Sequence, residues 1–130
     1  MSLFNLLFGN KQSNYQKGTV DYNAEKMSSK YPVNENGKFG EKGDNSRVIY
    51  AKNNIKESRK FYKKVSKGGV EQPLPKGNGV KKIMKDGGVV THREKTSTPN
   101  SPAVDLNGLK GEKVKNQKIH FEKKENKNGK

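Results

Sequence analysis

Residues 79–107 read GVKKIMKDGGVVTHREKTSTPNSPAVDLN, and a shorter stretch, QKIHFE, follows at 117–122. β-Prone residues lie on both sides of Asp86 and Gly87, and an Asp-Gly pair readily adopts the positive φ angles of a tight turn. Two strands joined by a hairpin are therefore expected. A loop rich in hydroxyl groups then leads through Pro99 and Pro102 into a third β-prone run. The order predicted is strand, turn, strand, loop, strand, with one more antiparallel strand at 118–121.

A helix is predicted upstream, at about 55–67, after a β-prone run at 47–51. Asn53 or Asn54 occupies the position of an N-cap, and Gly68 suits the position after the last turn. The apolar residues fall close to one helical face: Ile55, Phe61, Tyr62 and Val65. The basic residues on its other face form either a phosphate-facing ridge or a solvated surface: Lys56, Arg59, Lys60, Lys63, Lys64 and Lys67.

These elements predict an α+β domain over residues 46–123, with a small antiparallel sheet of about four strands and an N-terminal helix packed on one face. Residues 1–45 contain few apolar residues and are expected to form a linker or a loosely packed N-terminal arm. Residues 124–130 are expected to form a basic tail. The apolar opening, 3–8, is too short for a membrane-spanning helix and lacks the basic flank of a signal peptide.

The charge balance favours a polyanionic partner. The chain has 130 residues, with 28 Lys+Arg against 13 Asp+Glu and a formal net charge of +15. Nucleic acid, an acidic protein and an anionic membrane would all suit such a surface. No cysteine is present, which excludes disulfides, a cysteine-ligated zinc site and a cysteine nucleophile. Neither a metal nor another cofactor is expected.

Alternation along the predicted strands separates two faces, because successive side chains in a strand point to opposite sides. One face is apolar and is expected to pack beneath the helix: Val90, Val104, Leu106, Ile119 and Phe121. The other face carries polar residues: Thr91, Arg93, Asp105, Lys118 and His120. A polar face of this composition is a candidate surface for binding and cutting RNA.

The chemistry that this face suggests is transesterification without a metal ion, in which a base takes the proton of a ribose 2′-OH and an acid protonates the leaving oxygen. His120 is the leading candidate for proton transfer, since a histidine titrates near neutral pH. Its alternative is an exposed strand histidine with no task. His92 lies on the presumed core side, either as a packed residue or as a second catalytic histidine. Asp105 either orients a base or holds the end of its strand.

Preorganised cations and hydroxyl groups would stabilise the charge that develops on phosphorus. The candidates for this role are Arg93, Lys118, Thr96, Ser97 and Thr98. Few carboxylates lie in this region, which does not indicate a metallonuclease: Asp86, Glu94 and Asp105.

The combination MKDGGVVTHREKTSTPNSPAVDLN and QKIHF resembles the C-terminal toxin modules of bacterial polymorphic toxins, including contact-dependent inhibition and LXG-type proteins. The resemblance covers about residues 47–122, with the Gly68-Gly69 pair ending the preceding helix. It implies an α+β ribonuclease of the barnase, EndoU, colicin and RelE-like group. Such a domain would be secreted or displayed as part of a larger effector and would act in the cytoplasm of a competing cell. Its substrate would be RNA, often tRNA, and it would pair as a single copy with a cognate acidic immunity protein.

The resemblance carries over Thr91, Arg93, Thr98, Asp105 and His120 as candidates, with Lys85 and Lys118 as possible phosphate ligands. Together with the chemistry above, the catalytic candidates are Thr91, Arg93, Thr98 and His120, and the candidates for phosphate or RNA binding are Lys85, Lys118, Thr96, Ser97 and Asp105. The chain departs from the pattern at His92, where a tyrosine or phenylalanine is expected, and at Thr96 and Thr98, where serines are expected. A hydroxyl group remains at both loop positions. Two rival functions stay open: a non-catalytic nucleic-acid-binding module, and a lysine-rich module that binds proteins or anionic membranes.

Overall fold

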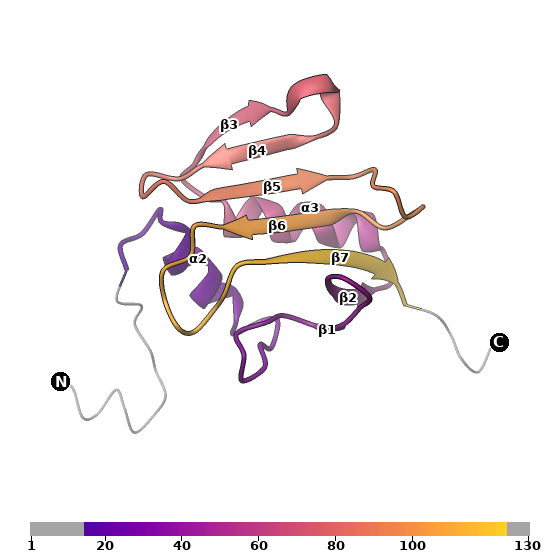
Figure 1. The fold of residues 1–130 in the computed structure, drawn as a ribbon, viewed down its shortest axis with the longest axis horizontal. Coiled ribbons are helices and arrows are strands. Elements are labelled where there is room, and N and C mark those ends of the chain that lie inside the picture. The colour runs from indigo at the N-terminus through magenta and orange to yellow at the C-terminus, as the bar shows by residue number, and fades with distance from the viewer. Residues whose placement is uncertain (1–14, 125–130) are drawn as a thin grey trace.

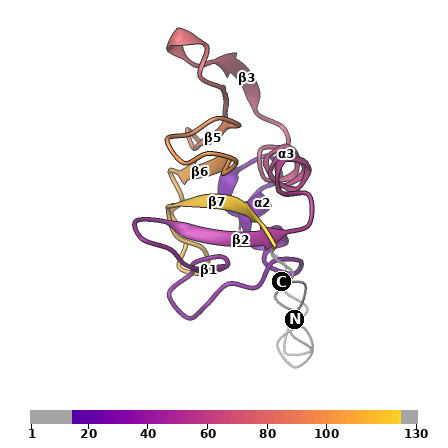
Figure 2. The same ribbon diagram turned by 90° about the vertical axis from the view of Figure 1, so that its right-hand side faces the viewer.

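One mixed sheet and two helices on one of its faces make up the described part of the chain, residues 15–124 of a computed structural model (Figures 1 and 2). The helices are α2 (Val20–Met27) and α3 (Asn54–Val65), and a short 3-10 helix, η1, spans Pro75–Gly77. The strands are β1 (Glu41–Lys42), β2 (Arg47–Ala51), β3 (Val70–Pro73), β4 (Val80–Ile83), β5 (Val89–Arg93), β6 (Ala103–Asn107) and β7 (Gln117–Lys123). Their order in the sheet is β1-β2-β7-β6-β5-β4-β3.

The hairpin between β4 and β5 is confirmed. Gly87 has a φ of 90°, and the backbone N–H of Gly88 donates to Asp86 Oδ1 at 3.0 Å. The N–H of Met84 donates to the carbonyl of Gly88 at 2.8 Å and closes the turn. A left-handed backbone at Gly87, the last residue of the three-residue loop 85–87, explains why glycine is present there.

Helix α3 begins after Asn53, whose side chain accepts a hydrogen bond from the N–H of Lys56 at 3.1 Å. The helix predicted at about 55–67 is therefore confirmed, with its last residue at Val65. Its buried face includes Phe61, and the buried amide of Asn54 donates to the carbonyl of Phe121 at 2.9 Å. This bond joins the start of α3 to β7, the strand that carries His120.

The core lies between α3 and the sheet, as the strand alternation predicts. All five predicted apolar strand residues are fully buried: Val90, Val104, Leu106, Ile119 and Phe121. From the helix, Phe61, Tyr62 and Val65 belong to the same cluster, whereas Ile55 is only partly buried and lies outside it.

The predicted four-stranded antiparallel sheet is wrong, because seven strands form one mixed sheet. Strand β2 joins it parallel to β7, and β1 adds a two-residue edge. The glycines and prolines of residues 68–79 predict a loop there, and this prediction is wrong for 70–73, where β3 pairs antiparallel with β4. Parallel pairing of segments far apart in the chain is decided by tertiary packing, which local patterns do not reveal.

Residues before the predicted domain boundary at 46 also contribute to the core. Helix α2 buries Val20, Ala24 and Met27, which follow the i, i+4, i+7 spacing of one helical face. Phe39 is fully buried, with its ring centroid 5.3 Å from that of Phe61. The loosely packed arm expected over 1–45 therefore does not describe residues 20–39. The expectations for residues 1–14 and 125–130 fall outside the described range.

Neither described helix is long and apolar enough to cross a membrane.

Candidate active site

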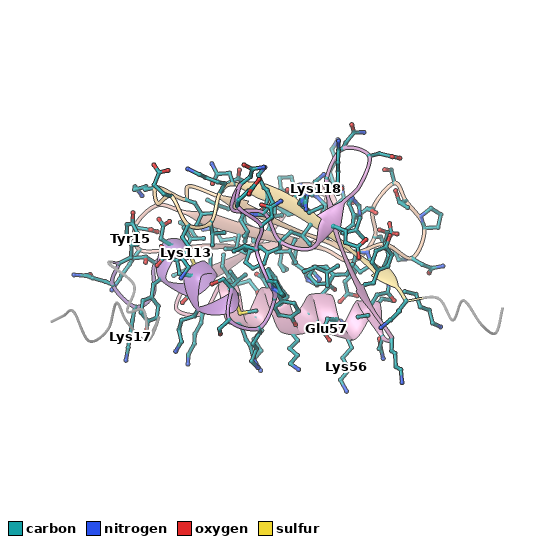
Figure 3. All side chains as sticks on the ribbon, turned by 90° about the horizontal axis from the view of Figure 1, so that it is seen from below. Tyr15, Lys17, Lys56, Glu57, Lys113 and Lys118 are labelled. Carbon is teal, nitrogen blue, oxygen red and sulfur yellow. The ribbon has the colours of Figure 1, made fainter. Side chains whose placement is uncertain are left out.

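Polar side chains from four strands lie together on the sheet face opposite α2 and α3. Thr91 pairs with Lys81 of β4 and with Asp105 of β6, and Asp105 pairs with Lys118 of β7. Directly paired residues point to the same side of a sheet, so these four side chains form one row. Figure 3 shows Lys118 on the side away from the helices. We call this surface, with Arg93 and His120, the open face.

A second row lies beside the first. Arg93 pairs with Ala103, Ala103 with His120, and His120 with Val48. Arg93 and His120 are therefore two strands apart, or about 10 Å between backbones, and flank a residue with only a methyl side chain. The prediction that Thr91, Arg93, Lys118 and His120 share one face is confirmed by this register.

His120 is held in one orientation by Ser101. Its Nδ1 lies 2.8 Å from Ser101 Oγ and 3.0 Å from the Ser101 carbonyl oxygen. Because a carbonyl can only accept a hydrogen bond, Nδ1 carries the proton in this contact. The hydroxyl of Ser101 then donates to Glu122 Oε2 at 3.2 Å. The chain Glu122–Ser101–His120 leaves the lone pair of His120 Nε2 available to accept a proton.

Arg93 is bound to Asp105 across the two rows. Its Nη1 lies 3.1 Å from Asp105 Oδ2, and the arginine and aspartate side chains are 38% and 19% exposed. Asp105 thus orients Arg93, whereas sequence reasoning considered orienting a base or holding the strand end. A half-exposed guanidinium still presents donors to a phosphate.

Thr91 is on the open face but only 8% exposed. Its hydroxyl makes no hydrogen bond to any residue between 15 and 124. A buried polar group without a partner is uncommon in folded proteins. A hydroxyl in this state, between Lys81 and Asp105, is suited to donate to a ligand bound on the open face.

The hydroxyl-rich loop between β5 and β6 is organised by Thr96. Its Oγ1 donates to the Ser101 carbonyl at 2.7 Å and accepts from the N–H of Thr98 at 3.2 Å. Thr96 thus binds the same carbonyl that fixes His120, which makes it a supporting residue of the loop. Ser97 and Thr98 are exposed at the loop surface.

Lys85 does not join the other candidates. It lies in the β4–β5 hairpin, at the opposite end of β5 from Arg93, and its side chain extends toward Gly18. The register therefore brings together Thr91, Arg93 and His120 but leaves Lys85 far along the strand.

His92 is packed under α3, as its place in the alternation predicts. It is 6% exposed, stacks on Tyr62 with ring centroids 5.0 Å apart, and lies 3.1 Å from Ser58 Oγ through Nε2. Since the Ser58 hydroxyl donates to the carbonyl of Ile55, it accepts from His92. His92 faces away from the open face, so it is placed as a core residue.

Burial is the main cause that lowers the pKa of His92 below its usual 6.5; Arg59 lowers it further, and the carboxylates of Glu94 and Glu71 oppose this in part. Below pH 6.5, the unfolded chain therefore binds a proton at His92 more readily than the folded chain does. The free energy of unfolding is thus retained above pH 6.5 and falls as the pH drops below it, by at most about 1.4 kcal/mol per pH unit. We expect urea unfolding to show a larger loss of stability from pH 7.5 to 5.5 in the wild type than in His92→Gln. Equal losses in the two proteins would contradict this assignment.

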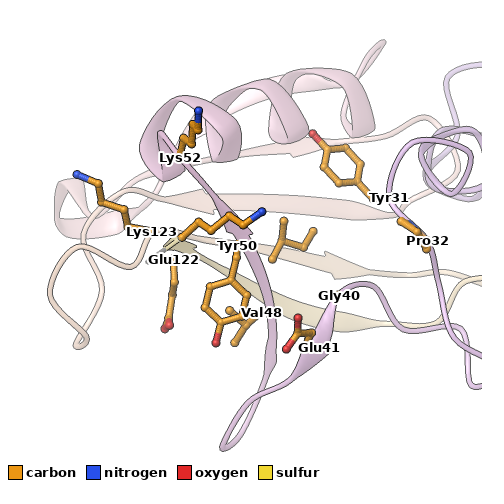
Figure 4. A pocket seen from close by; sticks show the side chains of 11 residues that line it. Tyr31, Pro32, Gly40, Glu41, Val48, Tyr50, Lys52, Glu122 and Lys123 are labelled. Carbon is orange, nitrogen blue, oxygen red and sulfur yellow. The ribbon is translucent and has the colours of Figure 1, made fainter. Parts of the chain in front are cut away.

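A recess of about 1050 Å³ adjoins the open face along β2 (Figure 4). Tyr50 pairs with Glu122 in the register between β2 and β7, and its side chain is 46% exposed. Strand β1 pairs only with Arg47 and Val48, so the second half of β2 has no partner strand on that side among residues 15–124. The recess is continuous with the Glu122–Ser101–His120 chain through Glu122.

Sequence reasoning missed Ser101 and Glu122. Alternation could have found Glu122, because it lies two residues after His120 and four after Lys118 on the same face. Ser101 precedes Pro102 at a loop end, where only the folded structure shows that it is 1% exposed and contacts His120.

Within residues 15–124, no three histidine, aspartate or glutamate side chains converge in a way that could hold a metal ion. The chain was compared with family models, curated proteins and solved structures, and none of them matches. The residues of the open face are therefore the basis of the function proposed below.

Proposed function

We propose that this chain is an endoribonuclease domain that cuts RNA by 2′-OH transesterification on the open face. The observation that carries the proposal is the fixed orientation of His120. Ser101 binds its Nδ1 at 2.8 and 3.0 Å, so that Nε2 is the atom available for proton transfer. A neutral imidazole with a free Nε2 acts as a general base toward a ribose hydroxyl.

In the proposed reaction, Nε2 of His120 takes the proton of the 2′-OH, and the 2′ oxygen attacks phosphorus. The bond to the 5′ oxygen breaks, giving a 2′,3′-cyclic phosphate and a 5′-hydroxyl, which takes its proton from solvent. Arg93, two strands away on the same row, stabilises the charge on the phosphoryl oxygens. Lys118, exposed in the neighbouring row, adds a second cation near the scissile phosphate.

The biological role proposed here is that of a toxin effector. It is supported by the resemblance of residues 47–122 to polymorphic toxin modules and by the net charge of +15, which suits both RNA and an acidic immunity protein. The domain would be delivered as part of a larger effector and would act in the cytoplasm of a competing bacterium. RNA, with tRNA as one class of substrate, would be its target.

The test uses the full chain with two oligonucleotides: a DNA strand that holds a single ribonucleotide, and the same strand made entirely of DNA. Cleavage is expected only 3′ to the ribonucleotide, with a 2′,3′-cyclic phosphate end and undiminished rate in EDTA. Induced expression in a susceptible bacterium is expected to give discrete fragments in total RNA. Binding of both strands without cleavage would instead support a non-catalytic nucleic-acid-binding module, and cleavage of the all-DNA strand would rule out attack by a 2′-OH.

A further inference from the structure

A groove on the helix-covered side of the molecule is lined by several lysines. It lies between α2 and the C-terminal end of α3, with a volume of about 740 Å³. Six lysines line it: Lys17, Lys26, Lys30, Lys64, Lys67 and Lys85. None of the six forms a salt bridge with a carboxylate of residues 15–124. Figure 3 shows Lys17 on this side, opposite Lys118 of the open face.

The groove is held in shape by a buried side chain. The Asn23 amide of α2 donates to the carbonyl of Val65 at 2.9 Å and to that of Lys67 at 3.0 Å. These bonds fix α2 against the end of α3 and use carbonyl oxygens that would otherwise repel an anion. Lys26 of α2 and Lys64 of α3 therefore extend from two helices that these bonds join.

Positive charge is crowded inside the groove. Contact with Lys30 is the main cause that lowers the pKa of Lys64, with a further contribution from Lys60. Crowding of ammonium groups is unfavourable in the free protein and is relieved when an anion lies between them. Because lysine is a point charge without the planar fork of arginine, such a site recognises charge spacing and carries little base specificity.

We propose that this groove binds the phosphate backbone of RNA, as a second contact remote from the open face and independent of base sequence. The choice of RNA over an acidic peptide rests on the proposed function of the open face. Lys85 lines the groove from the β4–β5 hairpin, and the two strands of this hairpin also carry Lys81 and Thr91 of the open face. An RNA chain that passes this hairpin contacts both surfaces, so the groove holds substrate while the open face cuts it.

The test measures binding of a fluorescent 2′-O-methyl RNA 12-mer, which lacks the 2′-OH and cannot be cleaved. The full chain is compared with the double variant Lys30→Gln/Lys64→Gln by anisotropy between 50 and 300 mM salt. At 100 mM salt, the variant is expected to bind about tenfold more weakly. Loss of two phosphate contacts is also expected to make the slope of log K against log salt shallower by about 1.4.

The matched control is Lys56→Gln/Lys63→Gln, which removes the same charge from exposed positions of α3 outside the groove. This control is expected to change affinity by less than about threefold. Equal weakening by both double variants would overturn the proposal in favour of diffuse charge attraction. A 12-residue oligoglutamate that competes as well as the RNA would overturn it in favour of an acidic protein segment. Because no cleavage is measured, failure here and failure of the nuclease proposal give separate results.

Discussion

Replacing His120 by alanine is expected to lower the rate of RNA cleavage by about 10²- to 10⁴-fold, the usual contribution of a positioned proton-transfer group. The imidazole is half-buried on the open face, with Nδ1 bound by Ser101. Its removal leaves Arg93 and Lys118 in place, so substrate binding should persist while the chemical step slows. The measurement is kcat and KM on the oligonucleotide with one ribonucleotide, and we expect the loss to fall on kcat.

His92→Gln is the matched control for this variant, because the chain has only two histidines. His92 lies on the helix-covered face, so the His92→Gln variant is expected to keep a kcat within about threefold of the wild-type value. A His120→Ala protein that cleaves at the wild-type rate would remove His120 from the mechanism. A His92→Gln protein that loses as much kcat as His120→Ala, at unchanged stability, would show that the two histidines act together.

Ser101 fixes the orientation of the His120 ring, and replacing Ser101 should have a different effect from replacing His120. Ser101→Ala removes the hydroxyl but keeps the carbonyl that binds Nδ1 at 3.0 Å. His120 therefore retains its proton on Nδ1 while losing the link to Glu122. Because it acts through His120, Ser101 is a positioning residue.

Much of the open face could be predicted from the sequence because alternation in a strand is a local property. Thr91 and Arg93 alternate with the buried Val90, and Lys118 and His120 alternate with the buried Ile119, so each strand assigns its own faces. The order of the strands in the sheet, by contrast, is not a local property of the sequence. Strand β2 lies parallel to β7, more than 60 residues away in the chain, and nothing in either segment specifies that partner.

The elements that sequence reasoning missed are those with weak local signals. The buried apolar residues of helix α2 are only Val20, Ala24 and Met27, and the sequence around them is mostly polar. Strand β3 is exposed along its whole length and ends in Pro73, which suits an edge strand and also resembles a loop. Both elements are stabilised by what they pack or pair against, and this information lies elsewhere in the chain.

Replacing Phe39 by alanine is expected to destabilise the fold by about 3–5 kcal/mol, the usual cost of removing a fully buried phenylalanine ring. Phe39 is 0% exposed and packs edge-on against Phe61. Its backbone N–H also donates to the buried side chain of Gln117 at 2.7 Å. The loss is a large share of the total stability of a small domain, and urea unfolding of the full chain should show a much lower midpoint.

Val70→Ala is the control, since Val70 is apolar but 66% exposed on the edge strand, and its loss should change stability by less than about 0.5 kcal/mol. The comparison decides whether the chain before residue 46 is part of the folded unit. A loosely attached arm would lose no more from Phe39→Ala than from Val70→Ala, and that result would contradict the core described here. A large loss would mean that a nuclease fragment starting at residue 46 lacks part of its own core. In such a fragment, the ring of Phe39 would no longer pack against Phe61, behind the strand β7 that carries His120. The buried side chain of Gln117 would also lose the hydrogen bond that it accepts from the N–H of Phe39.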